Sequence, residues 1–553
     1  MKASQARRIG ATLAVIAMVS VACGKSVSSS SSTPSGSSGP QLANTTTAGT
    51  QPVDKITWAL YRETNSLDPI YAFDYPENTV LSVLCEQLLH QNPDGSITSG
   101  LADLSYPDPT TMVFTLKPGI TFWDGNPLTP EDVVYSLERN TDPNLGGFYG
   151  ATFSRVKSIE ATGSDQVTIT LKEPDYWLAG ELASTPGWIV EKSYVEKEGK
   201  DFGTASGGTM CTGPYKFQSW KVGDKLVVVR NDNYWNPDVK PLVQEIDFVG
   251  APSEAALTSS MISGDINGSF AFSISTLDQL KSSSSVTVTA GNGWNTDAFI
   301  ISSFDGALGD VRVRQALSMA LDRQGIIDTV YKGAALMPKS LSAPGTWGYG
   351  GDVFANAYAQ LPDMTQNVAE AKKLVQEAGA TGKTITIGMS SELANLASEA
   401  SAYQSAAESI GLKVKLKSVS AANYINFFID PSYWKSVDGF FTTNYGDYAD
   451  PAALLSTLAL TDGSQNYSYF TDPKTGYNNP QVQQLLLAAR SEADPTKRAE
   501  DVAQAQAQIM KDLPWIPNAF PYNNVITSSN LTGATASFAY MFAPWANDLG
   551  GTG

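Results

Sequence analysis

The chain has 553 residues, with 37 basic and 55 acidic side chains, and a formal net charge of −18. This acidity disfavours nucleic acid as a partner, because a phosphate backbone would be repelled. The only histidine, His90, excludes zinc sites built on two or more histidines and most Ser-His-Asp or Cys-His hydrolase schemes. The 42% of hydrophobic residues is enough for several cores, and the length corresponds to three or four domains of ~150 residues.

The N-terminal residues 1–22 have the pattern of a secretory signal peptide. Three basic residues precede an apolar run from Ile9 to Ala22, which is shorter than the ~20 residues of a comfortable membrane span. The stretch Ser20–Gly24 resembles the bacterial lipobox, in which the cysteine, here Cys23, is lipidated. The usual leucine of that motif is replaced by Ser20, so an ordinary secretory signal with a chance cysteine is the alternative.

Residues 23–52 are predicted to be a disordered tether. They consist largely of Ser, Thr, Gly and Pro, contain no aromatic residue and include an unbroken serine run, Ser28–Ser32. No acidic residue occurs before Asp54, and loss of the three basic signal residues takes the net charge from −18 to −21. We therefore expect an acidic globule, lipid-anchored to the cell membrane on its extracytoplasmic face.

The two remaining cysteines, Cys85 and Cys211, form an even number in an oxidising compartment. A disulfide between them is the preferred interpretation. The alternative is a pair of buried free thiols that act as small apolar residues.

The first half of the folded body is predicted to be rich in strands. A helix is predicted over Asn78–Leu89, and another opens at Thr129, a capping residue followed by proline and two acids. Alternating polar and apolar residues predict strands at Lys55–Tyr61, Met112–Leu116, Gln166–Leu171, Tyr215–Trp220, Leu226–Arg230 and Glu245–Val249.

The second half is more helical. Asp310 is predicted to cap a helix that runs on to Ile327, and Asn367 another that ends at Gly379. The elements that follow are strand Lys383–Met389, helix Glu392–Ile410, strand Leu412–Val419, and helices Val482–Arg490 and Arg498–Leu513. Helices and strands that alternate with short glycine-marked connections are typical of an α/β sheet with parallel crossovers.

The C-terminal tail carries no basic residue after Lys511 but seven aromatic ones. So apolar a stretch is predicted to pack back onto an earlier domain, which would make that domain discontinuous in sequence.

Several motifs, in a fixed order, resemble family 5 of the bacterial extracellular solute-binding proteins, the receptors of ATP-driven oligopeptide, dipeptide, nickel and some oligosaccharide importers. The similarity extends over nearly the whole mature chain. The matching stretches are Gly100–Ala102, Val113–Gly119, Phe122–Thr129, Glu131–Arg139, Thr212–Tyr215, Tyr234–Trp235, Ser263–Ile266, Asp310–Leu317 and Ala320–Arg323.

The resemblance implies an α/β, two-lobed periplasmic-binding-protein-like (type II) fold with an inserted subdomain in the first lobe. The expected division is 53–84, 206–296 and 513–553 for lobe I, 85–205 for the inserted subdomain, and 297–512 for lobe II. Cys85 and Cys211 then stand at the two ends of the insertion, which favours the disulfide. Cys211 occupies a position where the family usually has glycine.

The resemblance also implies a site between the lobes. Oligopeptide-binding members present an aspartate to the peptide's α-ammonium, and Asp447–Pro451 matches that segment, which makes Asp447 the candidate. A turn aspartate bonded to its own backbone is the alternative. Aromatic candidates for the cleft wall, each of which would suit a core as well, are Tyr149, Trp294, Tyr445 and Tyr522.

The expected function is a binding protein and not an enzyme. It would capture a short peptide, act with the membrane permease of an ABC importer, work as a monomer and need no cofactor or metal. His90 is expected at the surface beside a turn. An oligosaccharide receptor of the same family is the first alternative; a secreted carbohydrate-active enzyme with paired carboxylates and a passive scaffold protein are weaker ones.

Overall fold

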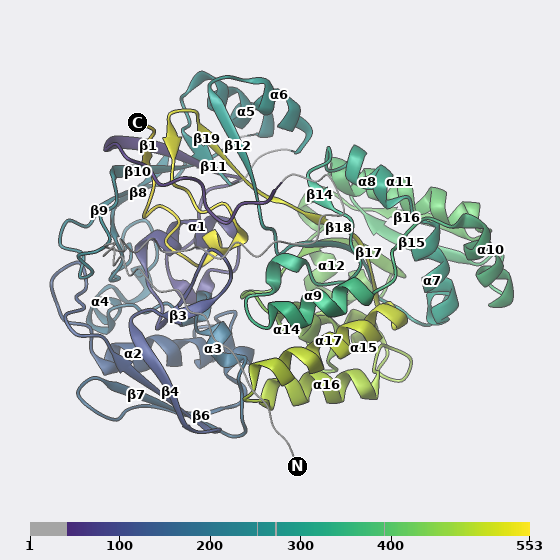
Figure 1. Cartoon of the computed structure of the whole chain (residues 1–553), viewed down its shortest axis with the longest axis horizontal. Coiled ribbons are helices and arrows are strands. Elements are labelled where there is room, and N and C mark those ends of the chain that lie inside the picture. Colours follow the sequence, from purple (N-terminus) through teal and green to yellow (C-terminus); the bar gives the residue numbers. More distant parts are fainter. Residues whose placement is uncertain (1–40, 252, 271–273, 392) are drawn as a thin grey trace, which may run out of the picture. The chain divides into compact units, whose positions relative to one another are not determined.

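The computed structural model describes residues 41–251, 253–270, 274–391 and 393–553. The predicted signal peptide and the predicted lipidation site, Cys23, lie outside these residues. The described chain folds around two large sheets, one of seven strands and one of six, covered by helices (Figure 1). No helix in this described part combines the length and the apolar character that a membrane span requires.

The seven-stranded sheet is the centre of lobe I and has the strand order β12-β19-β11-β1-β10-β9-β8. β1 is parallel to both of its neighbours, so the β10–α5–β11 unit crosses over it. Trp58 in β1 and Phe248 in β10 are no more than 2% exposed, which makes these strands the core of the lobe. The elements are β1 (Val53–Leu60), β8 (Tyr215–Lys221), β9 (Lys225–Arg230), β10 (Val243–Gly250), β11 (Gly268–Ser269), β12 (Val286–Gly291), β19 (Asn523–Ser528), α1 (Tyr75–Leu84), α5 (Glu254–Ser263) and α6 (Leu277–Ser282).

The six-stranded sheet is the centre of lobe II, with the order β14-β18-β13-β17-β15-β16. The β15–α11–β16 unit is the parallel crossover that the sequence predicts. The strands are β13 (Thr296–Ile301), β14 (Ala335–Leu336), β15 (Thr384–Met389), β16 (Lys413–Ser418), β17 (Gly439–Asn444) and β18 (Trp515–Pro521).

Two helices of lobe II, α7 and α10, begin at the predicted caps. The Asp310 side chain accepts from the backbone N–H of Arg312, and Asn367 from that of Glu370. The single helix predicted to reach Ile327 is two helices, because Asp322 accepts from the N–H of Gly325 and starts a new one. The helices are α7 (Val311–Ala320), α8 (Arg323–Thr329), α9 (Gly351–Gln360), α10 (Val368–Glu377), α11 (Ala394–Ser409), α12 (Asn426–Ile429), α13 (Pro431–Trp434), α14 (Pro451–Ala459), α15 (Tyr467–Thr471), α16 (Pro480–Ser491) and α17 (Pro495–Asp512).

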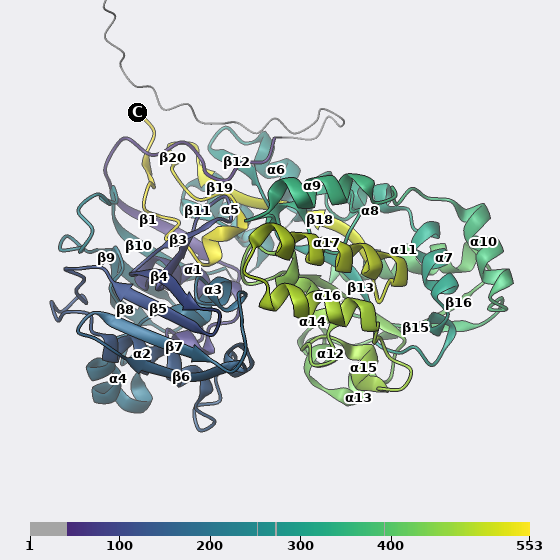
Figure 2. The ribbon, with the colours of Figure 1, turned by 60° about the horizontal axis from the view of Figure 1, so that its bottom comes forward.

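The inserted subdomain contains an antiparallel sheet of order β4-β5-β7-β6, whose strands follow one another in Figure 2. Thr129 and Asp132 form a reciprocal capping box at the start of α2, as the motif predicts. α1 ends at Leu84, earlier than predicted, because the chain becomes extended at Cys85 and turns into the insertion. The elements are β2 (Leu89–Gln91), β3 (Ile97–Ser99), β4 (Ala102–Asp108), β5 (Thr111–Leu116), β6 (Val156–Ala161), β7 (Gln166–Leu171), α2 (Pro130–Glu138), α3 (Leu178–Glu181) and α4 (Lys192–Glu198).

In the described chain two covalent crossings join the lobes, residues 292–295 between β12 and β13 and Tyr522 between β18 and β19. The two crossings lie side by side, because β12 pairs with β19 on their lobe I side and β13 pairs with β18 on their lobe II side. A Cβ on Gly293 would lie 2.2 Å from the carbonyl oxygen of Pro521, so this approach requires glycine. β18 belongs to the lobe II sheet, although the predicted division places everything from residue 513 in lobe I.

The segment 41–52 differs from the predicted tether. Ala43 donates a backbone hydrogen bond of 2.9 Å to Ala290, and Gly49 one of 2.8 Å to Asp548. Gln51 forms a bridge with Gly551 at the C-terminus. Backbone bonds of this kind need no apolar side chain, so the Ser/Thr-rich composition did not reveal that these residues belong to the folded body.

The aromatic tail returns to lobe I, as its composition predicts. β19 lies in the lobe I sheet, where Figure 1 shows its yellow chain among the purple and teal strands. The ring of Trp545 lies 4.2 Å from that of Trp58, and Phe538 and Phe542 are buried in the same core. Lobe I is therefore built from both ends of the described chain. The tail also carries the short strands β20 (Leu531–Thr532) and β21 (Gly550–Gly551).

Cys85 and Cys211 are joined by a disulfide, with their Cα atoms 4.9 Å apart. The neighbouring Glu86 carboxylate accepts hydrogen bonds from Thr212, Tyr234 and Trp235. A covalent and a polar tie thus hold together the two ends of the inserted subdomain.

Replacing Cys85 and Cys211 by alanine should lower the free energy of unfolding by ~4–5 kcal/mol at most, because the bridge closes a long loop. Urea unfolding of the parent and the double variant measures the difference. Non-reducing peptide mapping of the parent should recover the two cysteine peptides linked, and two freely alkylated thiols would contradict the pairing.

Candidate functional site

A cavity of ≈ 490 Å³ lies in lobe I at the carboxyl ends of β1 and β10. It is lined by Leu60 and Ala251, at the ends of these strands, and by residues at the start of α1 and α5, among them Tyr75 and Glu254. In open α/β sheets ligands bind outside the carboxyl ends of parallel strands, where neighbouring connections diverge. This lobe I cavity is therefore a candidate part of a binding site.

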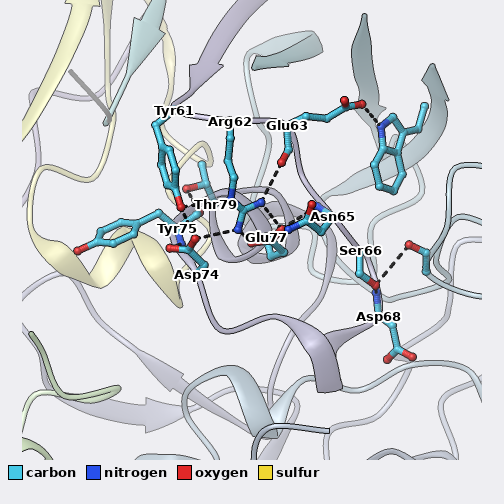
Figure 3. Close-up of polar contacts among 12 residues, drawn as sticks. Tyr61, Arg62, Glu63, Asn65, Ser66, Asp68, Asp74, Tyr75, Glu77 and Thr79 are labelled. Carbon is cyan, nitrogen blue, oxygen red and sulfur yellow. Dashed lines mark hydrogen bonds and ion pairs between the residues drawn. The ribbon is translucent and has the colours of Figure 1, made fainter. Parts of the chain in front are cut away.

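The loop after β1 is fixed by Arg62 (Figure 3). Its guanidinium donates two bonds to Glu77, one to Asp74, one to the carbonyl oxygen of Glu63 and one to the hydroxyl of Tyr61, at 2.8–3.2 Å. All five guanidinium N–H groups are used. The edge of the lobe I cavity is thus rigid, and Arg62 has no donor left for a ligand.

The second part of the site is the segment between β17 and α14, which contains Asp447. Gln91 of the inserted subdomain holds it, accepting from the N–H of Ala449 at 3.0 Å and donating to the carbonyl oxygen of Asp447 at 3.4 Å. The Asp450 carboxylate caps α14 by accepting from Ala452 at 2.8 Å. The backbone around Asp447 is therefore fixed on both sides.

The carboxylate of Asp447 is half-buried and has no hydrogen bond or ion pair with any described residue. Burial raises the pKa of Asp447 to about 6. Burial, followed by the charge of Asp447, raises the pKa of Glu181 in α3 to about 8, so Glu181 is mostly neutral at pH 7. The region holds a negative charge without a cationic partner, which suits a ligand cation.

Tyr149 and Tyr445 lie in the same neighbourhood as Asp447, whose charge contributes to the raised pKa of both hydroxyls after burial itself. Tyr149 donates to the carbonyl oxygen of Ala72 at 2.9 Å, and Tyr445 to that of Phe73 at 3.4 Å. The Tyr445 ring also lies 5.6 Å from that of Tyr75, which lines the lobe I cavity. The two parts of the site therefore adjoin.

Trp294 and Tyr522 are not brought to Asp447 by any contact in the described chain. Trp294 is 1% exposed and packs in the lobe I core, 5.5 Å from the ring of Phe538. The indole thus belongs to a core cluster that also contains Ala449, two residues after Asp447. Tyr522 is half-buried in the second crossing, where its N–H donates to Ala334.

His90 is half-buried in β2, opposite Thr98 of β3, and not at the open surface. Burial lowers the pKa of its imidazole. The sequence does not predict Glu181 as part of the site. A single acidic residue in a four-residue helix gives no indication that it lies near Asp447 in the fold.

The inserted subdomain is also fastened to lobe II. Asp175 and Arg490 form an ion pair of 2.5 Å, with side chains only 1% and 17% exposed. Tyr176 donates its N–H to the carbonyl oxygen of Arg490 at 2.8 Å, and Trp177 belongs to the lobe II core. Residues 175–177 are thus part of lobe II in packing, although they belong to the insertion in sequence.

Two α/β lobes joined by two crossings, with an unpaired carboxylate where they meet, define a two-lobed binding protein of the periplasmic type. The family described as bacterial extracellular solute-binding proteins, family 5 Middle, matches residues 97–466. The chain belongs to this family.

Known proteins agree with this assignment. The periplasmic oligopeptide-binding protein OppA of Salmonella typhimurium is 28% identical over 497 residues, which cover 85% of this chain and 88% of OppA. The periplasmic murein peptide-binding protein MppA of Escherichia coli is 28% identical over 498 residues, 84% of this chain and 86% of MppA.

Solved structures share the fold. The substrate-binding protein CtaP of Listeria monocytogenes superposes with a TM-score of 0.78 at 23% identity, over 91% of this chain and 100% of CtaP. DppA of Helicobacter pylori, in complex with the peptide STSA, superposes with a TM-score of 0.74 at 22% identity, over 91% of this chain and 99% of DppA.

Asp175→Asn should lower the free energy of unfolding by ~3–5 kcal/mol, because it leaves the Arg490 guanidinium buried without a counter-charge. Urea unfolding gives the value, and hydrogen exchange should show faster opening of residues 175–177. The matched control is Glu173→Gln, whose carboxylate pairs with Arg155 at 3.0 Å but is 58% exposed; it should cost ~0–1 kcal/mol. Equal effects of the two changes would contradict the buried tie.

Proposed function

We propose that this protein is the extracytoplasmic receptor of an ABC importer. It captures short peptides between its two lobes, closes on them and delivers them to a membrane permease. The names of its relatives support peptides as the ligand class, since OppA and MppA are both named for peptides and DppA was solved with one.

The observation that carries the proposal is the unpaired, half-buried carboxylate of Asp447. A peptide's α-ammonium would supply the missing charge and donate up to three hydrogen bonds. Closure of the lobes would exclude water and strengthen this pair, because the attraction between charges rises as the local dielectric falls. Tyr149 and Tyr445 would enclose the same end of the peptide.

The rest of the peptide would be held along its backbone. Strand-like hydrogen bonds to main-chain groups give affinity that does not depend on side chains, so one site accepts many sequences. Side chains would occupy pockets such as the lobe I cavity, where bridging water accommodates differences in size.

Asp447→Asn should weaken peptides that have a free N-terminus by ~2–5 kcal/mol, because their ammonium is left buried without its counter-charge. Calorimetric titration of the parent and the variant gives the change. Acetylation of the peptide N-terminus should cause a similar loss in the parent and little further loss in the variant.

Glu370→Gln, whose side chain on α10 of lobe II is 44% exposed, is the matched control and should leave peptide affinity unchanged. Equal affinity of the parent for free and acetylated peptides would remove Asp447 from the site. A parallel screen with cello- and xylo-oligosaccharides tests the alternative ligand class, and saturable binding of sugars alone would replace the peptide proposal.

Peptide affinity should fall as the pH drops through about 6, because burial raises the pKa of Asp447 to that value and protons then compete with the ammonium. Below this pH the dissociation constant should rise by about tenfold for each unit. Titrations between pH 5 and 7.5 measure the slope. Asp447→Asn should flatten it; an equally steep slope in that variant would assign the pH dependence to another group.

We also propose that Cys23 carries a lipid that anchors the receptor. Cys23→Ala should then move the protein from the membrane fraction to the soluble extracytoplasmic fraction, which fractionation and immunoblotting of intact cells measure. The double variant Cys85→Ala, Cys211→Ala, which keeps Cys23 and lacks the other two cysteines, is the control and should stay in the membrane fraction. Persistent membrane association of the Cys23→Ala variant would contradict the anchor.

A further inference from the structure

The lobe I cavity has aromatic walls. The rings of Phe270 and Tyr540 are stacked with centroids 3.6 Å apart, and the Trp58 ring lies 5.0 Å from Phe270. All three residues line the cavity, together with Tyr75. Aromatic faces attract both apolar groups and cations, since each ring carries a partial negative charge on its face.

The charged residues that line the cavity, Asp74 and Glu254, are both acidic. Arg62 pairs with Asp74, which lines the cavity, at 2.8 Å and with Glu77 at 2.8 Å. Its donors are saturated, as described above. Two carboxylates therefore share one guanidinium beside the cavity, and Glu254 forms no ion pair among the residues that the structure describes.

An acidic ligand group would find few donors at this position. The start of α1 offers little, because the N–H of Tyr75 is bonded to Asp74 at 2.8 Å and Pro76 has none. At the start of α5 the Ser253 side chain already accepts from the N–H of Ala256, and the negative charge of Glu254 in the first turn opposes a second anion.

We propose that the lobe I cavity is a side-chain subsite that selects a lysine or arginine side chain of the bound peptide and rejects an acidic one. The proposal rests on the proposed function and names the ligand class of one part of the same site. The apolar stem of the basic side chain lies along the rings of Trp58, Phe270 and Tyr540. Its charged head reaches the carboxylates of Asp74 and Glu254.

The position of the cavity fits a subsite of the proposed peptide site. Tyr75 lines the cavity and contacts Tyr445, which precedes Asp447 by two residues. A peptide anchored by its ammonium at Asp447 therefore starts beside the cavity, so a side chain near its N-terminus can enter. The volume of ≈ 490 Å³ lies within the range of small-molecule pockets.

The test uses the mature protein and tetra-alanine peptides in which one residue at a time is lysine, norleucine or glutamate. Norleucine keeps the apolar stem of lysine without its charge. At one peptide position, lysine should bind about three- to tenfold more tightly than norleucine, and glutamate more weakly than norleucine. Raising the salt concentration should reduce the preference, because the charges are partly exposed.

Glu254→Gln should bring the lysine-to-norleucine ratio at that position towards one, because it removes a carboxylate that attracts the lysine ammonium. Asp278→Asn is the matched control, since it removes an exposed acid from the first turn of α6 in the same lobe, away from the cavity. It should leave the ratio as in the parent.

Equal affinities for lysine, norleucine and glutamate at every position would overturn the subsite while leaving peptide binding intact. A lysine preference that Glu254→Gln does not reduce would overturn it as well. Absence of binding for every peptide would overturn the proposed function and the subsite with it.

Discussion

The fold depends on the close parallel course of two chain crossings between the lobes. Residues 292–295 and Tyr522 run side by side, since β12 pairs with β19 on one side of them and β13 with β18 on the other. Any rotation of one lobe against the other must occur within this short double segment. Gly293 allows the close approach, and Trp294 anchors the first crossing in the lobe I core. The position of Asp447 relative to the lobe I cavity follows from this hinge.

Much of the local structure could be predicted from the sequence, because it is set by neighbouring residues. The capping box of Thr129 and Asp132 and the caps Asp310 and Asn367 are where the motifs place them. The family could be predicted as well, since its motifs occur in a fixed order along the chain. What failed depends on long-range contacts: the backbone bonds of 41–52 and the membership of β18 in lobe II.

In the candidate site, too, some features could be predicted from the sequence and others depend on long-range contacts. The resemblance singled out Asp447, but no sequence pattern connects it with Glu181 in the inserted subdomain. Aromatic residues were the least predictable, because an indole suits a cleft wall and a core equally well. Tyr149 and Tyr445 lie near Asp447, whereas Trp294 is in the core. Burial of a single side chain depends on packing between distant segments, and one sequence does not contain that information.

Three aspartates near the junction of the lobes have different partners. Asp175 pairs with Arg490, and Asp450 caps α14, so both are satisfied by the protein itself. Asp447 has neither kind of partner in the described chain. A buried or half-buried charge without a partner costs free energy, and a ligand cation is the natural compensation. The contrast separates acids that hold the fold together from the one available for binding.

The disulfide between Cys85 and Cys211 has a consequence for the modularity of the protein. Since the chain enters and leaves the inserted subdomain at Cα atoms only 4.9 Å apart, the lobe I sheet is continuous without it. The insertion is in effect a cassette: a short turn could replace it without stretching the lobe I scaffold. The insertion is also tied to lobe I by the buried ion pair of Arg139 with Asp68 at 2.6 Å, and to lobe II through Asp175. Exchanging the cassette would therefore change its contacts with both lobes.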